Sequence, residues 1–186
     1  TTGRQIEAAA RLYMAQHGDT VAGKKIELIV KDDTSLPDQT RRLAQELIVN
    51  DKVNVLAGMG ITPSAMAVAP LATQSKTPLV VMAAATSSIT EASPYIVRTS
   101  FTLPQASVAL ADWAPKNGIK KVVTMVSDYG PGIDAAHLGA HEAHAVHIER
   151  LAFHVGTAHV DDGLHAELGA DGGRGDAVLA GAGLGD

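Results

Sequence analysis

Short apolar runs that alternate with amphipathic segments constrain the fold of this chain most. The amphipathic segments span residues 3–17, 38–50, 62–74 and 103–116, and the apolar runs span residues 25–31, 53–57, 79–83, 95–99 and 121–126. Short buried strands that are each followed by a helix form parallel sheets with helices on both faces. The sequence therefore predicts an α/β fold built on a doubly wound parallel sheet.

The first predicted element is a helix, although a doubly wound lobe ordinarily begins with a strand. Ile6, Tyr13 and Met14 recur on one face of residues 3–17, as in an amphipathic helix. We therefore expect an incomplete sheet, which either lacks its first strand or receives one from another chain. Because the sequence begins at Thr1 without a Met or a signal segment, we also expect the natural amino terminus to lie upstream.

Composition excludes several classes of function. The net charge is -5 and no run of Lys or Arg occurs, which argues against a nucleic-acid partner. There are no cysteines, so the chain has no disulfide, no cysteine nucleophile and no cysteine metal ligand. No apolar stretch reaches the roughly 18–20 residues that a membrane span needs.

The composition changes abruptly near residue 136. Seven of the eight histidines lie at or beyond His137, whereas all eight lysines lie at or before Lys121. Residues 168–186 consist almost entirely of Gly, Ala, Leu, Asp, Val and Arg, without the periodicity of an amphipathic element. We favour a coding sequence read out of frame for residues 136–186, and a natural low-complexity tail is the alternative.

Three turns at the carboxyl ends of apolar runs carry candidate binding residues. These turns span residues 58–62, 83–87 and 128–130. Ligands of open parallel sheets collect at such ends, where small residues expose backbone amides and helix amino termini favour an anion. Thr62 and Thr86 supply hydroxyl donors for a carboxylate, and Tyr129 supplies an aromatic wall.

Each of these residues also has a purely structural interpretation. Thr62 precedes Pro63 and is typical of a helix cap, with or without a ligand. Thr86 and Ser87 are suited to cap a short helix at residues 88–91, and Tyr129 is suited to a half-buried turn. The three turns together favour a polar or anionic ligand more strongly than any one of them does.

An ordered series of motifs resembles the branched-chain amino acid type of periplasmic binding protein. The series runs from Thr1 to about Ala135 and comprises TTGRQIEAAARLY, KIELIVKDD, DQTRRLAQELI, VNVLAGMGITPSAMAVAPLATQSKTPLV, AAATSSITEASPYIVRTSFTLPQ and KKVVTMVSDYGPGIDA. The resemblance implies a periplasmic receptor of an ABC importer, without a cofactor, whose partner is a membrane permease and whose two lobes close over a small ligand. Residues 1–117 would be the first lobe without its first strand, residues 118–135 the start of the second, and residues 136–186 the anomalous segment.

The resemblance also implies a set of ligand contacts. The hydroxyls of Thr62 and Thr86 and the backbone at Ala84 and Ala85 would hold a carboxylate from the first lobe, and Tyr129 would contact the ligand from the second. Amino-acid-binding members place an acidic residue after the strand that matches residues 95–99, and residues 100–105 contain none. We therefore expect a plain or aromatic carboxylate rather than an α-amino acid, bound weakly or not at all by a shortened chain.

Other functions stay open as alternatives. A doubly wound enzyme is disfavoured because the sequence lacks GxGxxG, GxxxxGK[ST] and GxSxG. His137, His141, His144 and His147 are spaced for one face of a helix at residues 133–147 that could hold zinc, but their place in the anomalous segment favours chance, and no metal site is predicted. The third alternative is a fragment without function that forms a homo-oligomer through exposed sheet edges.

Overall fold

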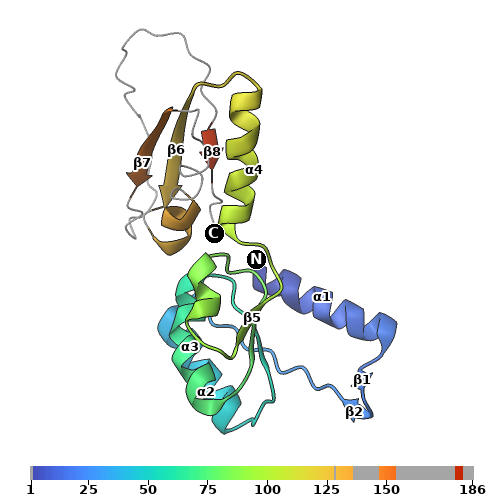
Figure 1. Ribbon diagram of the computed structural model, residues 1–186. Coiled ribbons are helices and arrows are strands. Elements are labelled where there is room, and N and C mark those ends of the chain that lie inside the picture. Colours follow the sequence, from blue (N-terminus) through green and yellow to red (C-terminus); the bar gives the residue numbers. More distant parts are fainter. Residues whose placement is uncertain (1, 128, 136–146, 154–178, 182–186) are drawn as a thin grey trace, which may run out of the picture. The chain divides into compact units, whose positions relative to one another are not determined.

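The computed structural model describes residues 2–127, 129–135, 147–153 and 179–181. The described residues up to Thr102 form one compact unit, and those from Leu103 onward form a second. Figure 1 shows helices and a sheet in each unit. The lobe boundary that we predict after residue 117 stays a prediction.

A three-stranded parallel sheet forms the centre of the first unit. Its strands are β3 (Leu56–Gly58), β4 (Leu79–Val81) and β5 (Ile96–Arg98), in the order β3-β4-β5. Gly58 pairs with Val81, which in turn pairs with Arg98, so the three strands end at the same level. This register brings the segments that follow the strands to one edge of the sheet.

Two helices and a short 3-10 helix complete this part of the first unit, namely α2 (Pro37–Val49), α3 (Thr62–Ser75) and η1 (Ser87–Glu91). The core consists mainly of small and aliphatic side chains from α3, β4 and η1, with Val68, Leu79, Val81 and Ile89 fully buried. Burial of each such side chain contributes about 1.5–3 kcal/mol. The Ala-rich face of α3 has little bulk, which allows close packing on the sheet.

The predicted strand at residues 25–31 is wrong. Only Lys24–Lys25 (β2) pairs, antiparallel with Thr20–Val21 (β1), through a tight turn in which Ala22 and Gly23 both have positive φ. Residues 26–33 belong to no helix or strand, and their large apolar side chains are exposed. The alternation of apolar residues requires a neighbouring strand to form a ladder, and among the described residues only the bond from Ile26 N to Asp19 O extends the β1–β2 pair into this segment.

The amino-terminal helix α1 (Thr2–His17) forms as predicted but has no buried residue. Leu12 and Tyr13 are exposed, and the Tyr13 ring stacks on the His17 ring at a centroid distance of 4.2 Å. Amphipathic helices in globular proteins normally bury their apolar face. In the described part of the chain, the apolar face of α1 is only partly covered, since Ile6 and Met14 are partly buried and Leu12 and Tyr13 are exposed.

The second unit contains α4 (Leu103–Lys116) and three parallel strands, β6 (Lys121–Ser127), β7 (His147–Phe153) and β8 (Leu179–Gly181), in the order β7-β6-β8. Residues 130–135 are helical. The expected helix at residues 133–147 is wrong at its end, because His147 begins β7. Ile148 and Phe153 are residue types that suit a strand.

Parallel strands with helices in both units confirm the predicted α/β class. No helix among the described residues is long and apolar enough to cross a membrane.

Candidate functional site

The turn after β3 leads directly into α3. Gly58 has a φ of 123° and Met59 a φ of 62°, a left-handed conformation that glycine adopts freely and other residues rarely. Two consecutive residues with positive φ reverse the chain sharply beyond the strand. This turn places Thr62, the first residue of α3, at the carboxyl edge of the sheet.

The turn after β4 is hydrogen-bonded to the turn after β3. Met82 N donates to Gly58 O at 2.7 Å, and Ala84 N donates to Met59 O at 2.9 Å. Ala84 is 2% exposed and Ala85 is partly buried. The Ala84 amide is committed to Met59, so this amide does not serve a ligand without breaking a bond within the protein.

The hydroxyls of Thr62 and Thr86 meet at a distance of 2.7 Å. Their residues are 8% and 6% exposed, so both belong to the interior of the turn region. A hydroxyl carries one proton and two lone pairs. When one of the pair donates to the other, a single proton is left for a ligand, and a carboxylate oxygen placed between them could accept from both.

The capping interpretation of Thr62 does not hold. The residue that precedes α3 is Ile61, which makes no side-chain cap, and Pro63 occupies the first turn as predicted. The Thr62 hydroxyl is bonded to Thr86 instead. Likewise, Thr86 precedes η1 without a side-chain capping bond. Both hydroxyls therefore face each other across the two turns.

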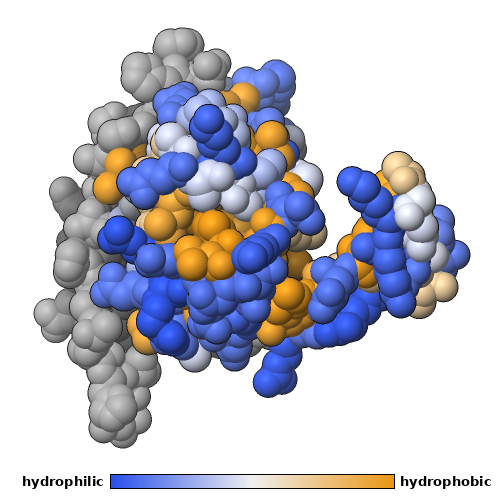
Figure 2. Space-filling view, turned by 90° about the horizontal axis from the view of Figure 1, so that it is seen from below, coloured by the Kyte–Doolittle hydropathy of each residue, from blue (hydrophilic) through white to orange (hydrophobic). Residues whose placement is uncertain are grey.

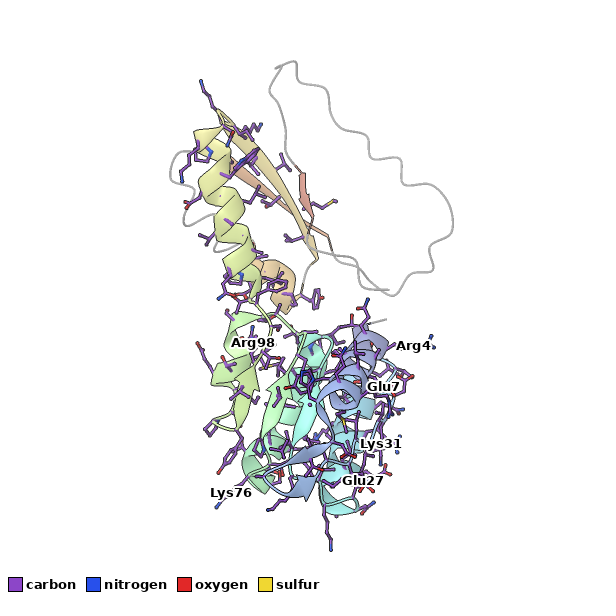
Figure 3. The ribbon with its side chains drawn as sticks, turned by 90° about the vertical axis from the view of Figure 1, so that its right-hand side faces the viewer. Arg4, Glu7, Glu27, Lys31, Lys76 and Arg98 are labelled. Atoms are coloured by element: carbon purple, nitrogen blue, oxygen red, sulfur yellow. The ribbon has the colours of Figure 1, made fainter. Side chains whose placement is uncertain are left out.

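Arg98, at the end of β5, contacts the backbone of the candidate site. Its Nη2 donates to Thr86 O at 2.6 Å and to Ser87 O at 3.3 Å. The side chain is partly buried, and Figure 3 labels it at the end of the sheet opposite to Lys76. Sequence reasoning missed Arg98, although a charged residue that ends an apolar run is a detectable signal.

A second polar cluster ties α2 to α3 beside Thr62. The Thr40 hydroxyl lies 2.5 Å from Asp33 Oδ2 and 2.8 Å from Ser64 Oγ. Because the single proton of Thr40 serves the carboxylate, Ser64 donates to Thr40. Asp33 Oδ1 also accepts from the Ser35 amide at 3.0 Å. The cluster fixes the first turn of α3, the turn on which Thr62 lies.

Tyr129 lies in the second unit, after β6, and is 43% exposed. Its carbonyl oxygen accepts a hydrogen bond from Ile133 N at 3.1 Å, within the first turn of helical residues 130–135. The structure thus brings together Thr62, Ala84, Ala85 and Thr86 within the first unit. That Tyr129 belongs to the same site stays a prediction.

The described residues contain no group of three or more His, Cys, Asp or Glu placed to hold a metal ion. His137, His141 and His144, which we considered for zinc, lie outside the described residues. His147 is the first residue of a strand rather than a helical residue, so the proposed single helical face does not extend to it.

Residues 1–158 match the family model described as periplasmic binding protein. The chain belongs to this family. This confirms the resemblance seen in the motifs, and the described fold is that of the family's type I members. Members of the family are solute-binding receptors.

Individual relatives resemble the chain over more than two thirds of its length. "Leu/Ile/Val-binding protein homolog 6" of Brucella abortus is 49% identical over 134 residues, which make up 72% of this chain and 34% of the relative. A solved solute-binding protein of an ABC transporter from Rhodopseudomonas palustris BisB5, in complex with 3,4-dihydroxybenzoic acid, is 62% identical with a TM-score of 0.80. The match covers 82% of this chain and 43% of that one.

A second R. palustris solute-binding protein, in complex with 4-hydroxybenzoate, is 46% identical with a TM-score of 0.80. The match covers 86% of this chain and 44% of that one. The chain thus spans about a third of the length of the curated relative and less than half of these structures.

Proposed function

We propose that this chain is part of a periplasmic receptor of an ABC importer and that the receptor binds a small aromatic carboxylate. The observation that carries the proposal is the pair of buried hydroxyls, Thr62 and Thr86, held 2.7 Å apart at the carboxyl edge of a parallel sheet. Hydrogen bonds to a charged group contribute about 1.5–3 kcal/mol each, so two such donors suit one carboxylate.

The choice of an aromatic acid rests on two further observations. Residues 100–105 hold no acidic side chain that could bind an ammonium group. The two solved relatives described above contain hydroxybenzoates. A hydroxybenzoate has no ammonium group, so it needs no such acidic partner. In this proposal Tyr129 contacts the ligand ring from the second lobe, and Ala84 and Ala85 line the first.

The proposal also places the receptor outside the cytoplasmic membrane with an ABC permease as its partner, and it assigns no enzymatic step to the chain. Family membership supports both statements. A binding site made of two threonine hydroxyls and backbone groups contains neither an activated nucleophile nor a general base within the described residues. Such a site holds a carboxylate without transforming it.

The test is a titration of the chain with 4-hydroxybenzoate, followed by amide NMR shifts. Because one lobe supplies only part of the contacts, we expect a dissociation constant on the order of 1 mM, near -4 kcal/mol. Thr86→Ala should abolish the shifts, whereas Thr90→Ala, an exposed threonine of η1, should leave them unchanged. Equal binding by both variants, or stronger binding of L-leucine than of the hydroxybenzoate, would refute the proposal.

We further propose, as a second candidate property, that copies of the isolated chain associate with one another. Leu12 and Tyr13 of α1 and the large apolar side chains of residues 26–30 are exposed. Figure 2 shows apolar side chains gathered on one face. In addition, β3 lies at the edge of its sheet, and an uncovered strand edge favours pairing with another chain. A homo-oligomer would cover these surfaces.

A further inference from the structure

Arg98 lies at the same edge of the sheet as the two threonine hydroxyls, on the strand next to β4. It pairs in register with Val81, directly before the turn that carries Ala84, Ala85 and Thr86. Its Nη2 donates to the carbonyl oxygens of Thr86 and Ser87 at 2.6 and 3.3 Å. One guanidinium therefore holds two consecutive peptide groups of the candidate site.

These two carbonyl oxygens would otherwise oppose an anionic ligand. A carbonyl oxygen carries partial negative charge, and the Thr86 oxygen belongs to the same residue as the ligand-binding hydroxyl. If the Thr86 carbonyl oxygen faced the carboxylate of a ligand, the oxygen would repel the carboxylate. Because Thr86 O also accepts from Ile89 N, at 3.4 Å, both of its lone pairs are directed within the protein. Arg98 thus turns the negative end of this peptide away from the ligand position.

The positive charge of Arg98 acts in the same direction. A guanidinium stays protonated in proteins. Its Nε and Nη1 atoms are buried, which weakens solvent screening of the charge. Covalent geometry keeps Thr86 Oγ1 within about 5 Å of the Thr86 carbonyl oxygen. The guanidinium therefore lies within about 8 Å of that hydroxyl, no farther than one Debye length in physiological salt.

We propose that Arg98 is the positioning residue that makes this site selective for an anion over a neutral ligand of the same shape. It acts through the peptide groups of residues 86 and 87 and through its charge, without contacting the ligand. The inference rests on the proposed function, which it deepens. It predicts that Arg98 adds selectivity for charge beyond that of the hydroxyl pair, whose hydrogen bonds a neutral amide can also form, although less strongly.

The experiment compares benzoate with benzamide, a neutral ligand of similar shape, by NMR titration of the chain. We expect Arg98→Met to weaken benzoate at least tenfold, a change of about 1.4 kcal/mol, and to alter benzamide less than twofold. Lys76→Met removes one positive charge at the opposite end of the sheet and should change neither constant. Arg98→Lys, which keeps the charge, should recover part of the benzoate affinity. Equal losses for both ligands, or no loss for benzoate, would overturn the proposal.

A measurement without ligand separates this inference from the proposed function. The carbonyl ¹³C resonances of Thr86 and Ser87 should shift in Arg98→Met and stay in place in Lys76→Met, because only the first variant removes their charged donor. Unshifted resonances would overturn the positioning role whether or not any ligand binds. If these resonances shift but the unmutated chain binds neither ligand, the proposed function fails and Arg98 is left with a structural role alone.

Discussion

The hydrogen bond between Thr62 and Thr86 joins two side chains that are 24 residues apart in the sequence and almost removed from solvent. A buried hydroxyl without a partner costs about 1–3 kcal/mol, whereas replacing both partners by apolar groups of the same shape can be nearly neutral. This asymmetry allows the contact to be tested without any ligand.

We predict that Thr86→Val lowers the free energy of unfolding by about 1–3 kcal/mol, because it leaves the Thr62 hydroxyl unpaired. Thr62→Val should have a similar effect, and the double variant should be less destabilised than the sum of the two. Urea denaturation monitored by circular dichroism measures all four free energies. Strictly additive effects would show that the two hydroxyls do not interact.

At the residue scale, the sequence predicts the places of Thr62 and Thr86 in the fold better than their contacts. Thr62 and Thr86 were placed at turns after strands, and the structure confirms those places. Their mutual hydrogen bond was not foreseen, because the register of two strands determines it and a single sequence does not reveal register. Arg98 was missed for the same reason, since only pairing with Val81 brings it beside residues 86 and 87.

Among the elements, the segment that precedes α2 is held to the rest of the first unit by a lysine side chain. Residues 26–33 join no strand of the described part of the chain, but Lys31 Nζ donates to Glu46 Oε1 at 2.8 Å and to Asp51 Oδ2 at 2.9 Å. Figure 3 labels Lys31 in this segment. The hydrogen bonds to Glu46 and then Asp51 raise the pKa of Lys31 above its ordinary value of 10.5. The protonated lysine therefore favours the folded state.

The stabilising effect of Lys31 should depend on pH with a definite sign. Because its pKa is higher in the folded state, the contribution is complete below pH 10.5 and is lost as the pH rises through the folded value. Lys31→Met should therefore lower the urea midpoint at pH 8, and the difference from the unmutated chain should shrink at strongly alkaline pH. Lys24→Met, an exposed lysine of β2, serves as the matched control. A difference that persists unchanged above the folded pKa would contradict the ion-pair explanation.

Most helices were predictable, since α2, α3 and α4 carry periodic apolar residues and proline or turn signals at their ends. The strand predicted at residues 25–31 failed for a physical reason. A strand is stabilised by its neighbours, and the alternation KIELIVK shows only that such a segment suits a ladder. The β1–β2 hairpin was missed because its two-residue strands are too short to show alternation.

The surfaces of the whole molecule lead to a prediction about its mass in solution. Leu12 and Tyr13 of α1 are exposed together with large apolar side chains in residues 26–30. Light scattering should give a mass of about twice that of the chain at high concentration. Leu12→Glu should shift the equilibrium toward the monomer, whereas Gln5→Glu, which adds the same charge at an exposed polar position of α1, should not. A monomer at every concentration would exclude this association.

The bond from Met82 to Gly58 continues the β3–β4 ladder past the end of β4, and the bond from Ala84 to Met59 continues it past the ends of both strands. The two turns that carry the threonines are therefore held by the sheet in a structure that contains no ligand. A ligand that binds to these turns loses its own translational and rotational freedom. It does not have to order the turns as well, and ordering them would reduce the affinity. In the proposed receptor, association at these turns should accordingly proceed at the rate of encounter.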